Sequence, residues 1–223
     1  MKSFFRADNP VWKFIGNLAD FFVLSLLWAL CSVPVVTAGA ATTALYYVTL
    51  KMASNQEGRL WQQFFHAFRR NFRAATLLWI GFLTAGAVLA ADLYYGLRYG
   101  LRGGSAGAQA MLVLALVVTL LYLCLLSFVF ALLARVENRP AAIFAMAGGM
   151  LLHNFLPVLS GVLVMTGFWL VGIFVFAPLL VVVPGFPAYC NSFLYNRILA
   201  HYGFSLEDRD GARRGEGDQA GDP

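Results

Sequence analysis

The chain has 223 residues, of which 60% are hydrophobic and 12% are charged, and its formal net charge is +5. Its mean hydropathy of +0.71 exceeds what the core of a soluble protein requires, so the composition indicates an integral membrane protein and excludes an ordinary soluble domain. In such a protein the basic residues indicate which side of the membrane a segment occupies, rather than binding to a polyanion.

Four apolar segments are each about as long as the ~20 residues that cross the hydrocarbon core of a bilayer. They are residues 18–36, 74–95, 110–134 and 155–177. Two shorter segments follow proline and glycine breaks, at residues 39–51 and 185–197. The sequence therefore predicts an all-α integral membrane protein with four long transmembrane helices, two short Pro/Gly-broken membrane helices, and amphipathic interfacial helices. Turns are expected at Pro34, Gly39, Pro184 and Gly185.

The basic residues indicate whether the two short segments cross the membrane. If neither crosses, the 16 Lys and Arg residues divide almost evenly between the two sides. If both cross, only Arg98 and Arg102 lie on the outer side. Because loops rich in Lys and Arg stay in the cytoplasm, we predict six crossings with both termini cytoplasmic.

This topology divides the membrane domain, residues 1–204, into three hairpin units at residues 3–51, 59–134 and 139–197. Each unit would contain an interfacial helix, an outward helix, a turn and an inward helix. The units resemble one another weakly, so internal duplication and chance similarity both stay open. Residues 205–223 have no apolar periodicity and are expected to form a disordered cytoplasmic tail.

An asparagine stands at the expected start of each outward helix. These residues are Asn17, Asn71 and Asn154. Asn71 is unusual because it falls inside the apolar arc of its helix. Its side chain could hydrogen-bond into the bundle, or it could cap a junction between two helices, and capping is the commoner role of asparagine at helix starts. Both interpretations make Asn71 structural.

The sequence RLWQQFFHAFRRNFR, residues 59–73, predicts an amphipathic helix. On a helical wheel, Leu60 and the aromatic side chains occupy one arc, and every Arg, Gln and His occupies the opposite arc. This separation disfavours nucleic-acid binding, in which rings and cations face the same strand, and favours a helix that lies among lipid headgroups. The interfacial residues we single out are Trp61, Phe64, Phe65, Phe68, Arg69, Arg70 and Arg73.

The chain shows no pattern typical of catalysis or of cofactor binding. It contains no nucleophile elbow, phosphate-binding loop or metalloprotease motif. Its three Cys and three His residues are scattered and do not stand at ligand spacing. No ionisable residue falls at a predicted membrane midplane, where ion-coupling groups usually lie. We therefore expect a protein that is not an enzyme and that holds no metal and no cofactor.

Three stretches resemble a known family. They are residues 4–51, which include PVVTAGAATTALYYVTLK, then FFHAFRRNFRAATLLW at 64–79 and PGFPAYCNSFLYNRI at 184–198. These stretches are similar to the YesL-like membrane proteins of bacteria, a family classed as a domain of unknown function. The resemblance covers nearly the whole chain up to His201. The family has no established catalytic or binding residues that could be transferred to this sequence.

The resemblance implies a location in a bacterial plasma membrane and a genetic context, because such proteins are commonly encoded beside carbohydrate-uptake ABC transporters. We expect a non-catalytic accessory component that contacts the lipid bilayer and the permease or sensor subunits of such a transporter. The alternative is an independent carrier of a small neutral solute such as a sugar, because interrupted short helices often mark midplane binding sites. The sequence leaves an oligomer open.

Overall fold

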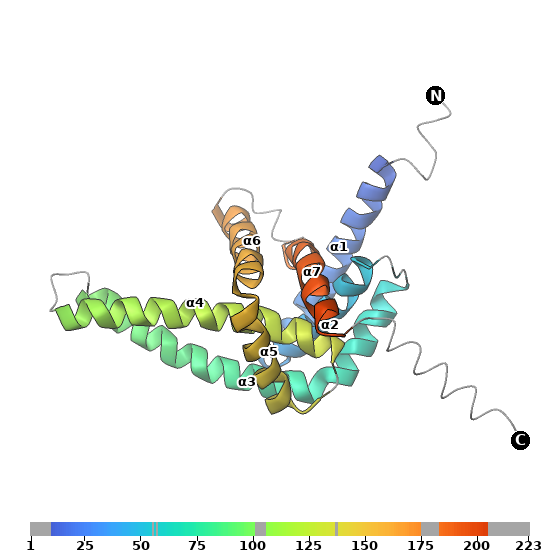
Figure 1. Ribbon diagram of the computed structural model, residues 1–223. Coiled ribbons are helices and arrows are strands. Elements are labelled where there is room, and N and C mark those ends of the chain that lie inside the picture. Colours follow the sequence, from blue (N-terminus) through green and yellow to red (C-terminus); the bar gives the residue numbers. More distant parts are fainter. Residues whose placement is uncertain are drawn as a thin grey trace, which may run out of the picture.

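The computed structural model describes residues 10–54, 56, 58–100, 106–136, 138–174 and 183–204, and it leaves out the side chains of residues 10–18 and 100. Within these ranges the regular structure is helical and contains no strand, which confirms the all-α class. The described residues form seven α-helices, which are labelled in Figure 1. They are α1 (Pro10–Ser32), α2 (Ala38–Met52), α3 (Leu60–Gly100), α4 (Ala106–Arg135), α5 (Pro140–His153), α6 (Phe155–Phe174) and α7 (Gly185–His201), with a 3-10 helix η1 (Val35–Thr37) between α1 and α2.

Among the described residues, three helices are long and apolar enough to cross a membrane, within residues 60–99, 106–135 and 155–174. The predicted membrane-helix character is therefore confirmed. The described apolar parts of α1 and α5, residues 19–32 and 140–153, are shorter. The expected set of four long and two short membrane helices stays a prediction, and so do the six membrane crossings.

The two helices expected at residues 59–73 and 74–95 form one continuous helix, α3. No proline interrupts residues 60–100, and the first glycine in α3 is Gly81. The side-chain nitrogen of Asn71 donates to the backbone carbonyl oxygen of Ala67 at 3.1 Å, a bond within the same helix. Asn71 therefore lies inside α3, not at a helix start. Figure 1 shows that α3 bends, so its first turns run at an angle to the part beside α4.

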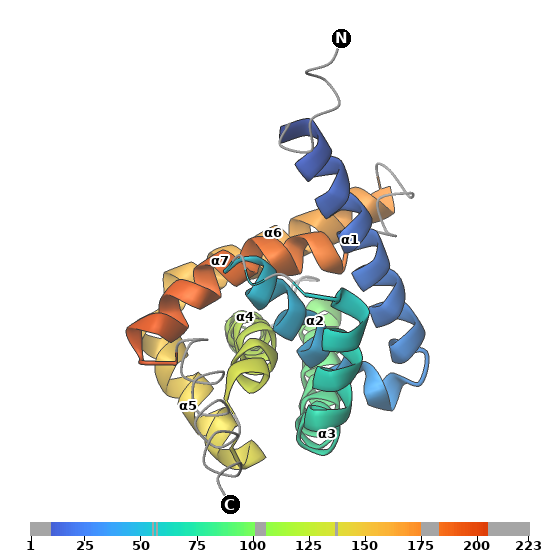
Figure 2. The same ribbon diagram turned by 90° about the vertical axis from the view of Figure 1, so that its right-hand side faces the viewer.

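Helices α2, α4 and α7 form the inner layer of the molecule. α1 packs on α2 and α7, α3 packs on α2 and α4, and α6 packs on α4 and α7 (Figure 2). α5 lies against α4 and α3. These three buried helices are the ones that the hairpin scheme predicts to run from the outer side back to the cytoplasmic side. The boundaries of the three units stay a prediction, and residues 205–223 lie outside the described ranges.

The far halves of α3 and α4 project from this core as a two-helix arm (Figure 1). We use the name arm for residues 81–99 of α3 and 106–125 of α4. Within the arm the Tyr122 hydroxyl donates to the Phe82 carbonyl oxygen at 2.9 Å. α6 runs across the arm in both views, not beside it (Figures 1 and 2). The long helices therefore do not form one parallel bundle.

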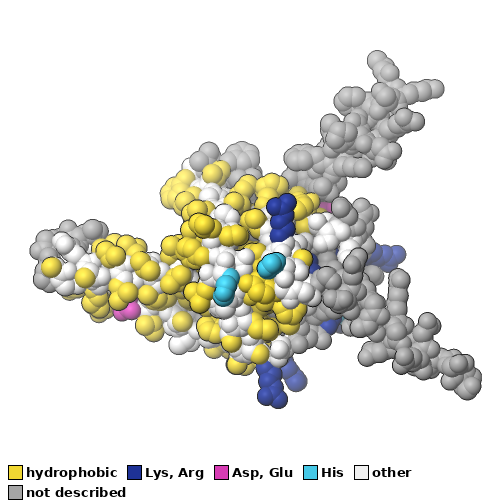
Figure 3. All heavy atoms as spheres, viewed as in Figure 1, with side chains coloured by type: hydrophobic (Ala, Val, Ile, Leu, Met, Phe, Trp, Pro, Cys, Tyr) yellow, Lys and Arg dark blue, Asp and Glu magenta, His cyan; other side chains and the backbone are white. Residues whose placement is uncertain are grey.

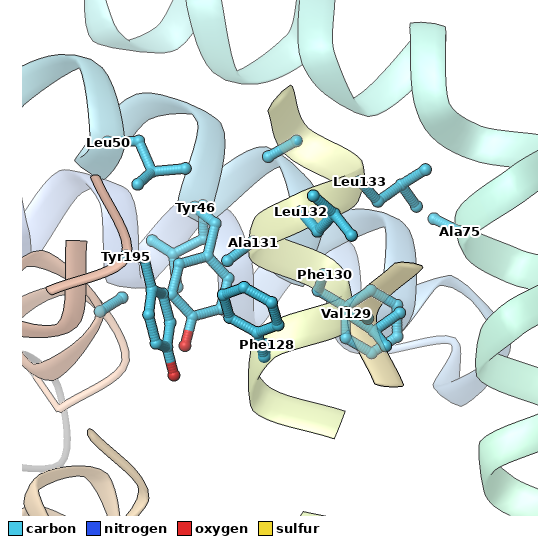
Figure 4. Packing of buried hydrophobic residues seen from close by; sticks show 14 of the residues in the cluster. Tyr46, Leu50, Ala75, Phe128, Val129, Phe130, Ala131, Leu132, Leu133 and Tyr195 are labelled. Carbon is cyan, nitrogen blue, oxygen red and sulfur yellow. The ribbon is translucent and has the colours of Figure 1, made fainter. Parts of the chain in front are cut away.

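The core is built around α2, whose side chains are largely buried. Figure 4 shows Tyr46 of α2 beside Tyr195 of α7 and Phe128 of α4. The ring centroids of Tyr46 and Tyr195 are 5.8 Å apart, and those of Phe128 and Tyr195 are 5.4 Å apart. All three side chains are fully buried. This aromatic contact joins the three inner helices.

The glycines at the two short helices lie where helices approach closely. Gly39 is the second residue of α2 and Gly185 is the first residue of α7, and the only described glycine with a positive φ is Gly203. A Cβ at Gly39 would lie 2.5 Å from the Trp79 Cβ, and one at Gly185 would lie 2.8 Å from the Phe21 carbonyl oxygen. Gly39 therefore lies in the contact between α2 and α3, and Gly185 lies in the contact between α7 and α1. Pro34 is exposed before η1, and Pro184 is buried before α7.

We expect Gly39→Ala and Gly185→Ala each to destabilise the protein by about 1–3 kcal/mol, because the added methyl group overlaps a neighbouring helix. Gly149→Ala is the matched control, since a Cβ there meets no atom within 4 Å. Thermal unfolding in detergent measures the effect. Melting curves of the Gly39 and Gly185 variants that coincide with that of the control would contradict the close contacts.

Candidate functional site

The first turns of α3 carry the aromatic and basic residues singled out in the sequence. Phe64 is fully buried and Phe68 is half-buried, whereas Trp61 is 59% exposed and Phe65 is 40% exposed. The rings follow one another along the helix, with centroids 6.4 Å apart for Phe64 and Phe68 and 5.5 Å apart for Phe68 and Phe72. One edge of this aromatic row therefore packs on the core, and the other edge is free to contact lipid.

The arginines lie away from the core. Arg69 and Arg73 are exposed and Arg70 is half-buried. The sequence-based separation of rings and cations is thus present along one continuous helix. Figure 3 shows that, on the face in view, Lys and Arg side chains gather around the core, while the surface of the arm is mostly hydrophobic. A helix with this arrangement can place its rings in the acyl boundary and its guanidinium groups among headgroup phosphates.

The three asparagines differ in their surroundings. Asn71 is buried inside α3, as described above. Asn154 lies between α5 and α6, where its side-chain nitrogen donates to the Met150 carbonyl oxygen at 3.0 Å and to the Tyr202 hydroxyl at 3.2 Å. It therefore connects the start of α6 with the end of α7. Asn17 lies within α1, and its side chain is outside the described part of the chain.

A buried polar network lies between the inner helices. The Ser192 hydroxyl donates to Thr49 Oγ1 at 2.9 Å, which links α7 with α2. The Asn191 side-chain nitrogen donates to the Gly161 carbonyl oxygen at 3.0 Å, which links α7 with α6. Tyr195 shares a short hydrogen bond with Ser127 of α4. Buried polar groups of this kind fix the relative positions of membrane helices.

A second polar cluster, which the sequence analysis did not identify, joins the ends of the inner helices. Arg135, the last residue of α4, is only 8% exposed. Its guanidinium group donates to the side-chain oxygen of Asn196 and to the Phe204 carbonyl oxygen, the latter at 3.2 Å. Asn196 in turn donates to the Leu50 carbonyl oxygen at 3.1 Å and to Ser54 Oγ at 3.0 Å. Arg135 and Asn196 therefore tie α4 and α7 to the end of α2.

These two networks consist of hydrogen bonds between protein groups. Among the residues that the structure describes, no group of three or more His, Cys, Asp or Glu side chains is placed to hold a metal ion. Exposed features that could contact another molecule include the aromatic and basic surface of α3, the apolar surface of the arm, and apolar side chains of α1 and α6. The arrangement suits contact with lipid or with another membrane protein.

Comparison with known protein families finds a match to part of the chain. Residues 21–93, which run from α1 through α2 into the arm, match the family described as "Protein of unknown function, DUF624". No curated protein and no solved structure matches the chain. The match includes the aromatic and basic surface of α3 and the close contact at Gly39. A family of unknown function is consistent with the resemblance seen in the sequence.

The burial of the rings on α3 predicts unequal effects of their removal. Phe64→Ala should destabilise the protein by about 3 kcal/mol or more, because it leaves a cavity in the core. Phe65→Ala should cost less than about 1 kcal/mol in detergent, since that ring is partly exposed. Thermal unfolding of the two variants, which differ by one position, measures the difference. Equal losses of stability would contradict the orientation of α3.

Proposed function

We propose that this protein is a non-catalytic accessory component of a bacterial carbohydrate-uptake ABC transporter, and that it contacts the permease or sensor subunits of that transporter. The family match and the resemblance to YesL-like membrane proteins support this proposal, because the resemblance implies a genetic context beside such transporters. The matched family has no known activity. The proposed role therefore rests on the exposed surfaces of the structure.

The observation that carries the proposal is the hydrogen bonding between the inner helices. The hydroxyl groups of Thr49, Ser192 and Tyr195 and the side-chain nitrogen of Asn191 take part in bonds that join neighbouring helices. A solute carrier needs polar groups directed into a binding space near the midplane. An accessory protein instead needs exposed helix faces, which the arm and the first turns of α3 supply. We therefore place the carrier function second.

We also propose that the chain lies in the plasma membrane with both termini in the cytoplasm. The exposed Arg69 and Arg73 and the exposed Arg139 belong to the part of the molecule from which the arm extends. Positive charges of this kind remain on the cytoplasmic side and attract its anionic lipids. In this orientation the tip of the arm reaches the outer side.

Single-cysteine labelling in a background without Cys31, Cys124 and Cys190 tests this orientation. We expect an impermeant thiol reagent, added to intact cells, to label Gly103→Cys and not Asn138→Cys, because the far end of α3 lies outside in this orientation. Permeabilised cells should allow both to react, which serves as the control. Labelling of Asn138→Cys alone in intact cells would reverse the proposed orientation.

Affinity purification from native membranes after mild cross-linking tests the accessory role. We expect the transporter subunits to purify with the chain, and the Arg69→Gln/Arg70→Gln/Arg73→Gln variant to recover about tenfold less of them, a loss equivalent to ~1.4 kcal/mol. The variant should still insert and fold, because these side chains lie outside the core. Arg98→Gln, which changes an arginine at the far end of α3, is the matched control.

Two results would contradict the accessory role. The first is recovery of no transporter subunit with the unsubstituted chain. The second is sugar uptake into proteoliposomes that contain only this purified protein, which would favour the carrier. The triple variant isolates the contribution of the cations, since Phe64, Phe65 and Phe68 remain in place to hold α3.

A further inference from the structure

An apolar groove of about 1030 Å³ lies where α5 meets the arm. Leu77, Phe82, Val118 and Phe144 are among the side chains along it. The polar side-chain atom in its lining is the Tyr122 hydroxyl, which already donates to the Phe82 carbonyl oxygen. Its volume is at the upper end of the ~300–1,000 Å³ typical of ligand sites. A groove of this composition binds hydrocarbon and offers water no partners.

The groove opens on the outside of the molecule. Leu77, Val88 and Leu152 line it and are each more than half exposed. α3 and α4, which form two of its walls, are candidate membrane-spanning helices. In a membrane, the outside of these helices faces acyl chains. The most accessible hydrocarbon at this place is therefore that of the bilayer itself.

The length of the groove matches one leaflet. Along α3 it extends from Leu77 to Val88 or Leu89, which corresponds to roughly 17 Å at the rise of an α-helix. Half of a hydrocarbon core of ~30 Å is about the same. A transmembrane helix of a second chain would instead need a surface through both leaflets. The dimension thus favours a single acyl chain that enters from one side.

Two exposed arginines stand at the end of the groove that begins with Leu77 and Pro140. Arg73 precedes Leu77 by one helical turn on α3, and Arg139 directly precedes Pro140 at the start of α5. Figure 3 shows basic side chains gathered below the start of α5. Guanidinium groups form charge-assisted hydrogen bonds with phosphate oxygens. Basic pockets between membrane helices on the cytoplasmic side are typical binding places of anionic headgroups.

We propose that this groove is a binding site for an anionic glycerophospholipid of the cytoplasmic leaflet. One acyl chain fills the groove between α5 and the arm, and Arg73 and Arg139 bind the phosphate of the headgroup. The lipid thereby joins α5 to the arm at a place where the protein leaves hydrocarbon surface uncovered. The assignment to the cytoplasmic leaflet rests on the proposed orientation of the chain, whereas the lipid site itself stands or fails separately from the association with a transporter.

Native mass spectrometry of the full chain tests the site. The protein is reconstituted with equal amounts of phosphatidylglycerol and phosphatidylcholine of the same acyl chains, and the lipid that stays bound is identified. We expect the unsubstituted chain to retain phosphatidylglycerol about tenfold more strongly than phosphatidylcholine. Equal retention of the two lipids would show that the headgroup is not recognised and would overturn the proposal.

Variants that fill the groove separate this site from general lipid contact. Gly81 and Gly148 line the groove, and a Cβ at either meets no atom within 4 Å. Gly81→Phe/Gly148→Phe should therefore fold and lower the retention of phosphatidylglycerol about tenfold. Gly149→Phe is the matched control, because Gly149 is also free of close contacts and does not line the groove. Retention that is equal in the filled variant and the control would overturn the groove as the site.

Variants at the arginines test the headgroup contact without altering the groove. Arg73→Gln/Arg139→Gln should lose the preference for phosphatidylglycerol while still retaining some lipid, and Arg69→Gln should keep the preference. A preference that survives in the double variant would contradict the assigned phosphate contact. A dimer that dissociates when the groove is filled would assign the groove to a second copy of this chain, against the proposal. The arginine variants keep the test decisive even if the filled variant does not fold.

Discussion

The close packing of α2 against α3 is the contact on which the rest of the structure depends. α2 has 15 residues and is buried along most of its surface. Its first half carries small side chains at Gly39, Ala40, Ala41 and Ala44, which let neighbouring helices approach its backbone. The indole nitrogen of Trp79 on α3 donates to the Val35 carbonyl oxygen at 2.6 Å, so the connection from α1 is fixed to the same helix. A larger side chain at Gly39 would move α3 away from α2. Because α4 packs on both helices, its contacts would change as well.

The helices themselves could be predicted from apolar length and from proline positions, but the continuity of α3 could not. Pro34 separates α1 from α2, Pro140 is the first residue of α5, and Pro184 precedes α7. Around Asn71 the hydrophobic pattern changes from one-sided to nearly all-round, and this change suggested two helices. The pattern reports the surroundings of each side chain, whereas the backbone follows local propensity. Because no proline or glycine interrupts residues 60–80, the helix continues while its surroundings change from interface to apolar interior.

At the candidate site, too, the sequence pattern predicts which side chains share a helix face, whereas the tertiary packing determines which of them are buried. The helical wheel placed Phe64 and Phe65 in one apolar arc. That arc covers both the protein core and the outside, so only the tertiary structure separates a fully buried ring from a partly exposed one. The burial of Arg135 was missed for a related reason. A count of basic residues treats each arginine as solvated, and the oxygens of Asn196 and Phe204 that make its burial favourable come from a distant part of the chain.

The continuity of α3 has a mechanical consequence for any molecule that binds its first turns. A loop between an interfacial helix and a spanning helix would absorb a rotation of the interfacial helix through a few backbone dihedrals. In α3 the hydrogen-bonded backbone continues from Trp61, past the contact at Trp79, to the arm. A tilt of the basic first turns therefore also moves the helix face that packs on Gly39. Arg73, the proposed lipid contact, lies between the first turns of α3 and Trp79. A bound headgroup and the core of the protein would therefore be connected through one continuous helix.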